Sequence, residues 1–91
     1  MTKNFFITYN RFTDEITLLT GHDELSGHSE FQLRTSHREP RVYLSDLANY
    51  LSGKYPHRKM LLKSGLPRDQ EEILEDIIHN NEYLNKVSVI Y

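Results

Sequence analysis

Alternating hydrophobic and polar positions predict two strands near the start of the chain. Phe5, Ile7 and Tyr9 share one face at a spacing of two, and residues 15–20 alternate in the same way after a break. The intervening residues 10–14 are mostly polar, as is typical of a hairpin loop. This pattern predicts an antiparallel hairpin.

A third strand is predicted after a polar segment. Residues 21–29 contain two glycines and show no periodicity, so we expect a long loop there. Residues 30–35 alternate again and predict a strand, and residues 36–40 interrupt that pattern. The short run 41–44 either extends the sheet or leads into a helix.

The first helix is predicted to begin at Ser45, a residue type that commonly caps helix N-termini. Leu47, Tyr50 and Leu51 follow at helical spacing. Gly53 is expected to end the helix at the position after its C-cap, where glycine is favoured.

A strand, a longer helix and a last strand are predicted in the remainder of the chain. Residues 58–63 enclose a short apolar run, and residues 66–78 carry apolar side chains at helical spacing. Residues 86–91 alternate as a final strand. The residues expected in the contact between this helix and the sheet are Ile73, Leu74, Ile77, Ile78, Leu61, Val87 and Val89.

The predicted element order, β-β-β-α-β-α-β, indicates a small α/β (α+β) fold with a mixed sheet. The opening hairpin is antiparallel, whereas strand–helix–strand units favour parallel neighbours. We expect both helices on one face of the sheet and the last strand at its centre. The 91 residues predict a single compact domain, residues 1–91, because two domains would each be too small to bury a core.

The charges are unevenly distributed, although the net charge is only −2. Residues 32–63 carry seven Lys or Arg against two Asp or Glu, while the flanking segments are both acidic. This balance excludes a histone-like polycation. The basic segment has two interpretations: a patch for phosphate or an acidic protein surface, or a segment neutralised internally by the acidic C-terminal helix.

Few features indicate catalysis or metal binding. His22 and His28 are six positions apart, which matches no standard zinc ligand spacing, and the chain has no cysteine. We find no nucleophile elbow, metalloprotease motif or phosphate-binding glycine loop, and we expect no cofactor. No apolar run is long enough to span a membrane, and a cytoplasmic location is expected.

Phe12 is the clearest candidate for a contact residue. An apolar aromatic at a turn tip has no evident role in the core, and interface anchors are often such residues. Together with Tyr43, Arg38 and Arg41 it forms the predicted protein-binding set. A small domain without a site motif is typical of antitoxins, immunity proteins and phage-encoded inhibitors. Our main hypothesis is therefore a non-enzymatic regulator or inhibitor that occludes a partner protein.

Two alternatives remain open at this point. The first is an RNA- or DNA-binding module that uses the basic segment, with its cations on one uncovered face. The second is a small ribonuclease-like enzyme. The residue types that such an enzyme needs around a phosphate are present in His37, Arg38, Arg41 and Tyr43. A homodimer formed through a sheet edge is compatible with all three hypotheses. The candidate nucleic-acid contacts are Arg34, Arg38, Arg41, Arg58 and Lys59.

Overall fold

A computed structural model describes residues 2–21 and 27–90 and confirms the predicted α+β class and element order. His22 and most of the predicted loop 21–29 lie outside the described residues. His28 belongs to a strand. The elements are β1 (Lys3–Asn10), β2 (Glu15–Thr20), β3 (His28–Arg34), α1 (Pro40–Lys54), β4 (Met60–Ser64), α2 (Arg68–His79), the 3-10 turn η1 (Glu82–Leu84) and β5 (Val87–Ile90).

The five strands form one mixed sheet in the order β3-β2-β1-β4-β5. β1 pairs antiparallel with β2 and parallel with β4, and β4 pairs parallel with β5 across the α2 connection. The expectation that the last strand is central is wrong, because β5 lies at the edge. The central position belongs to β1, whose Phe5 and Ile7 are fully buried, whereas Val87 and Val89 of β5 are only half-buried.

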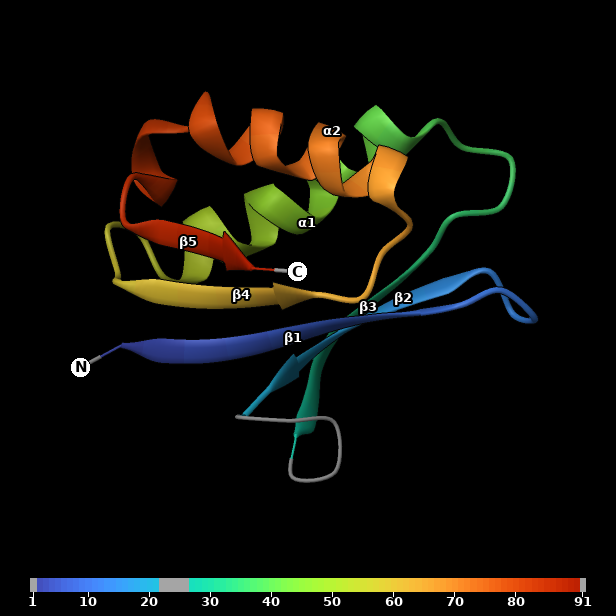
Figure 1. Ribbon diagram of the computed structural model, residues 1–91, viewed down its shortest axis with the longest axis horizontal. Helices are drawn as coiled ribbons and strands as arrows, with labels where there is room; N and C mark the ends of the chain where they lie inside the picture. Colours follow the sequence, from blue (N-terminus) through green and yellow to red (C-terminus); the bar gives the residue numbers. More distant parts are fainter. Residues whose placement is uncertain (1, 22–26, 91) are drawn as a thin grey trace.

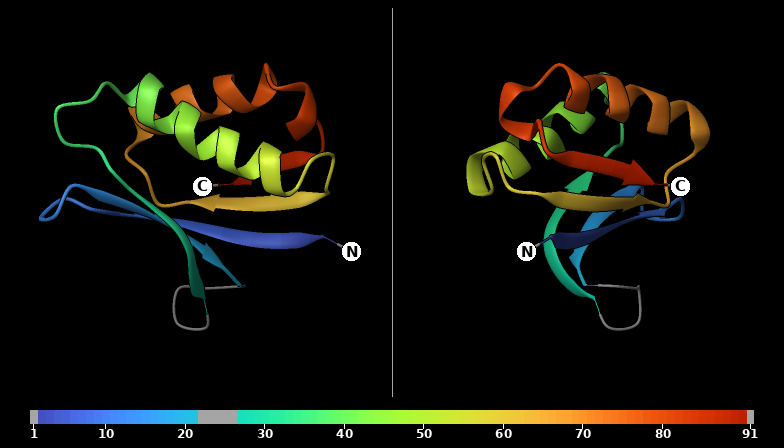
Figure 2. Two further views of the ribbon diagram at one scale, coloured as in Figure 1. Left: turned by 180° about the vertical axis from the view of Figure 1, so that it is seen from behind. Right: turned by 60° about the vertical axis from the view of Figure 1, so that its left-hand side comes forward.

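Both helices cover one face of the sheet, as the sequence predicts (Figure 1 and the right panel of Figure 2). Alternation along each strand sends its buried side chains toward that face. α1 and α2 close the other side of the core with their own apolar stripes. The buried apolar residues of the strands are Phe5, Ile7, Ile16, Leu18, Met60 and Leu62, and those of the two α-helices are Tyr43, Leu44, Leu47, Ala48, Leu51, Leu74 and Ile78.

α1 begins at Pro40, five positions before the predicted start at Ser45. Proline is favoured in the first turn, where its missing N–H has no helical partner in any case. Ser45 does not cap the helix; its hydroxyl donates to the carbonyl oxygen of Arg41 at 2.6 Å. Gly53 also differs from the prediction, because the helix continues through it to Lys54.

α2 covers the sheet with two of its four predicted apolar residues. Leu74 and Ile78 are buried, whereas Ile73 and Ile77 are half-buried. The predicted place of Leu61 beneath α2 is wrong: the buried neighbours Met60 and Leu62 face the helices. Since successive side chains on a strand point to opposite faces, Leu61 lies on the uncovered face of the sheet.

Candidate functional site

The tip of the β1–β2 hairpin presents Phe12 to solvent. Its side chain is 93% exposed, and the Phe12 N–H donates to Asn10 Oδ1 at 2.9 Å. This bond is typical of a turn in which an asparagine side chain replaces a backbone acceptor. Asp14 ends the turn with a φ of 53°, a conformation that aspartate adopts more readily than most residues. The exposure expected for Phe12 is therefore confirmed, while its role in binding stays a prediction.

Asp14 ties the hairpin tip to the segment between β3 and α1. Its carbonyl oxygen accepts from the Thr35 N–H at 2.8 Å and from the Thr35 hydroxyl at 3.2 Å. Its carboxylate accepts from the Ser36 hydroxyl at 3.2 Å and the Tyr9 hydroxyl at 3.4 Å. From the sequence alone, Asp14 is only a residue of the hairpin loop. Two of its partners, Thr35 and Ser36, lie 21 and 22 positions away, a separation that no local pattern encodes.

Arg38 and Arg41 lie at this same end of the molecule. The left panel of Figure 2 shows the hairpin tip and the segment before α1 side by side. The Arg38 guanidinium pairs with Asp46, and Arg41 Nη1 lies 3.1 Å from Asp76 Oδ2. All four side chains remain partly exposed, so these ion pairs contribute little to stability but orient the arginines.

We call this region the hairpin-end surface and define it as residues 11–13, residues 36–38, Arg41 and Val42. Val42, in the first turn of α1, is 51% exposed and adds a second apolar side chain. Aromatic residues and arginine are the types most enriched at the energetic centres of protein interfaces. The region therefore combines exposed apolar groups with oriented cations on a hydrogen-bonded support.

Tyr43 does not belong to this surface. Its side chain is only 3% exposed and packs in the core with the other apolar residues of α1. The prediction that Tyr43 is a contact residue is therefore wrong, because its ring is buried and not accessible to a partner. It also removes Tyr43 from the phosphate-binding group of the ribonuclease alternative.

Tyr43 predicts a loss of stability at alkaline pH. Burial, and to a smaller extent the neighbouring Tyr9, raises the pKa of the Tyr43 hydroxyl above 10.0. A group whose pKa is raised by folding contributes stability below its unfolded pKa and loses it as the pH rises through the folded value. We expect urea unfolding to show a smaller drop in stability between about pH 8 and about pH 11 for Tyr43→Phe than for wild type. Equal drops would contradict the prediction.

The five candidate nucleic-acid contacts fall into two groups. Arg34, Arg38 and Arg41 lie at or just before the N-terminal end of α1, whereas Arg58 and Lys59 follow its C-terminal end. α1 has 15 residues and is about 22 Å long. The length of this helix separates the two groups, so the chain does not gather all five cations into one compact patch.

The second group joins a cluster of cations around Tyr55. The Nζ atoms of Lys3 and Lys54 lie 5.0 and 5.6 Å from the centre of the Tyr55 ring, and the guanidinium carbon of Arg58 lies 6.0 Å from it. The Tyr55 hydroxyl donates to Glu30 Oε1 at 2.5 Å, and Lys54 lies 3.7 Å from the same oxygen. Arg58 thus packs against an aromatic ring of the fold itself.

Internal neutralisation of the basic segment is partial. One ion pair of the expected kind, Arg41 with Asp76, joins the basic segment to the acidic helix α2. Two others use Asp46 in α1 and Glu30 in β3. Within the described ranges, Arg34, Arg58 and Lys59 form no ion pair. Internal pairing therefore accounts for only part of the segment, and a binding role for the remaining cations stays a prediction.

The described residues hold no group of three or more His, Asp or Glu side chains placed to bind a metal ion. None of the helices in that part of the chain is long and apolar enough to cross a membrane. Comparisons with protein-family models, with curated proteins and with solved structures find no match.

Proposed function

We propose that this protein is a regulator or inhibitor that binds a partner protein through the hairpin-end surface and occludes it. The observation that carries the proposal is the 93% exposure of Phe12 on a turn whose shape is set by hydrogen bonds. An exposed phenylalanine contributes almost nothing to the stability of the fold. A rigid support lowers the entropy lost when the ring enters a pocket on a partner.

The charges beside Phe12 indicate the chemistry of the partner. Arg38 and Arg41 have carboxylate partners at the surface, and a carboxylate of another protein can replace either one with similar geometry. The complementary surface is therefore an apolar pocket with an acidic rim. Such pairs at the rim of an interface mainly raise the association rate and the specificity.

Phe12→Ala is expected to abolish stable binding of the partner. Truncating an aromatic anchor costs about 2 kcal/mol or more, which weakens affinity at least about 30-fold. The measurement is quantitative co-purification from lysate of the source cells, followed by calorimetry with the identified protein. Tyr83→Ala is the matched control, because Tyr83 is also exposed but lies on η1. Its affinity should equal that of the wild type.

A gel-shift experiment distinguishes the nucleic-acid alternative. Gel shifts with short RNA and DNA should remain empty for the wild-type protein at physiological salt. A complex whose affinity falls steeply with salt, and which disappears when Arg34, Arg38 and Arg41 are changed to glutamate, would instead favour nucleic-acid binding. Retention of the protein partner by Phe12→Ala would also contradict our proposal.

A further inference from the structure

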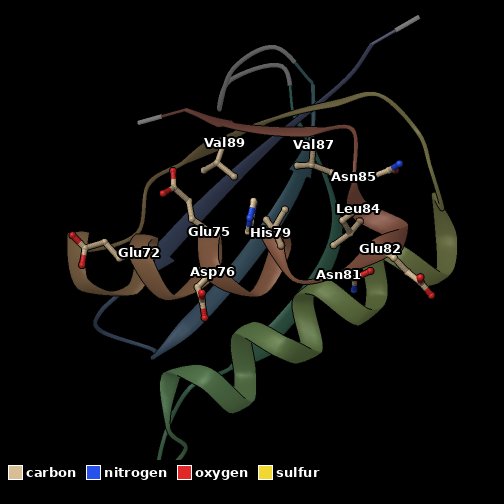
Figure 3. A pocket seen from close by; sticks show the side chains of 11 residues that line it. Glu72, Glu75, Asp76, His79, Asn81, Glu82, Leu84, Asn85, Val87 and Val89 are labelled. Atoms are coloured by element: carbon tan, nitrogen blue, oxygen red, sulfur yellow. The ribbon is translucent and has the colours of Figure 1, made fainter.

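A groove runs between α2 and the edge strand β5 (Figure 3). Its volume is about 700 Å³. Glu75 and His79 project from α2 toward the strand that carries Val87 and Val89, as Figure 3 shows. Ile78 and Leu84 complete the apolar lining. The groove is thus apolar at its base and open along the outer side of the sheet.

Among the described residues, no backbone group pairs with the outer edge of β5 beside this groove. The Met60 N–H donates to the carbonyl oxygen of Lys86 at 3.1 Å, and Met60 is in register with Val87. In a parallel ladder this pairing turns the backbone groups of Lys86 and Ser88 toward β4. The N–H and C=O groups of Val87, and of Val89 two residues on, therefore point away from the sheet, while the side chains of both residues line the groove. An edge of this kind can accept a further strand.

The rim of the groove is strongly acidic. Four carboxylates line it: Glu72, Glu75, Asp76 and Glu82. Two of them are paired at the surface, Asp76 with Arg41 and, at 3.9 Å, Glu72 with Arg68. Within the described part of the chain, Glu75 and Glu82 form no ion pair. The rim therefore retains negative charge that a ligand can neutralise.

We propose that this groove binds an extended, lysine- or arginine-rich segment of a partner protein, which adds to the sheet as a strand next to β5. The free groups of Val87 and Val89 pair with its backbone. Alternate side chains of the added strand enter the groove, where basic groups meet Glu75 and Glu82. This site adjoins the hairpin-end surface at the Arg41–Asp76 ion pair, but Val87, Val89 and Glu75 are not part of that surface, so either proposal can fail without the other.

The negative charge of the rim favours a basic strand over a second copy of the chain as the occupant of this edge. A symmetric pairing of β5 with β5 would place the same acidic rim of each copy at one interface. Like charges held across neighbouring strands are destabilising. The groove therefore favours a basic strand and disfavours a homodimer at this edge.

The test uses a fluorescein-labelled octapeptide of alternating lysine and valine, with binding to the full chain followed by fluorescence anisotropy at low salt. Glu75→Lys is expected to weaken binding about tenfold, because one attraction is replaced by a repulsion. Glu71→Lys is the matched control: Glu71 is also on α2 but does not line the groove, so the affinity should change less than twofold.

Strand addition has a distinct signature in the peptide backbone. Two peptides, N-methylated at either the lysines or the valines, block opposite edges of the added strand. One of them should lose binding at least tenfold, and the other should bind like the parent. Equal affinity of the two, or equal binding of a glutamate–valine octapeptide, would overturn the proposal. A dimer in sedimentation that is lost in Val89→Pro would also overturn it, by showing that a second copy occupies the edge.

Discussion

Replacing Leu74 with alanine is expected to lower the free energy of unfolding by about 2–5 kcal/mol. Leu74 is fully buried at the centre of α2, where it packs over the sheet. The substitution removes buried apolar atoms and leaves a cavity that a small core fills only partly. Domains of this size are stabilised by only about 5–10 kcal/mol, so the loss is a large fraction of the total.

Urea unfolding measures this effect as a shift in midpoint with an unchanged slope. Ile77→Ala is the matched control, because Ile77 lies on the same helix but is only half-buried. Its expected cost is about 1–2 kcal/mol, since part of its apolar surface is already in water. Equal midpoint shifts for the two variants would show that α2 does not cover the sheet through Leu74.

Gly65→Ala is the second substitution from which we expect a large effect, a loss of about 1–3 kcal/mol. Gly65 follows β4, and its N–H donates to the carbonyl oxygen of Ile7 at 2.8 Å. A Cβ at Gly65 would lie 2.7 Å from that same oxygen. The obstacle is backbone of the central strand, which no rotation of a side chain relieves. Either the hydrogen bond or the junction of β1 with β4 must shift.

Gly53→Ala is also a glycine-to-alanine substitution, but we expect it to raise the stability of the protein. Gly53 lies within α1, and a Cβ there would meet no atom within 4 Å other than its chain neighbours and the backbone of its own helix. Alanine should stabilise the helix by about 0.5–1 kcal/mol, because glycine loses more backbone entropy on folding. In thermal unfolding, the midpoint temperature of Gly53→Ala should be higher than that of the wild type, and the midpoint of Gly65→Ala should be lower. A wild-type midpoint for Gly65→Ala would contradict the close approach to Ile7.

The two glycines also show how far sequence reasoning extends. Gly65 is recognisable from the chain as part of a turn, but the reason that alanine is unfavourable there is a contact with Ile7, 58 positions earlier. Gly53 is a helix terminator by its residue type, yet α1 continues through it to Lys54. Residue preferences are statistical and local, whereas steric conflict depends on which strands become neighbours.

In the candidate site, too, some features are predictable from the sequence and others depend on the tertiary structure. Phe12 is identifiable from sequence, since an aromatic residue in a polar turn has no apolar partners at strand or helix spacing. Tyr43 is equally aromatic and lies among cations in the sequence, but α1 begins early enough to turn its ring into the core. The support of the hairpin tip through Asp14 and Thr35 depends on a contact between segments 21 positions apart.

The sequence by itself determined the element order, the class of the fold and the buried face of β1. These follow from periodicities of two and 3.6 residues, which express the geometry of single elements. Only the tertiary structure decided the strand order, the position of β5 at the edge and the acidic groove beside it. Those features depend on which elements become neighbours, and the free energy of such long-range contacts is not encoded in any local pattern.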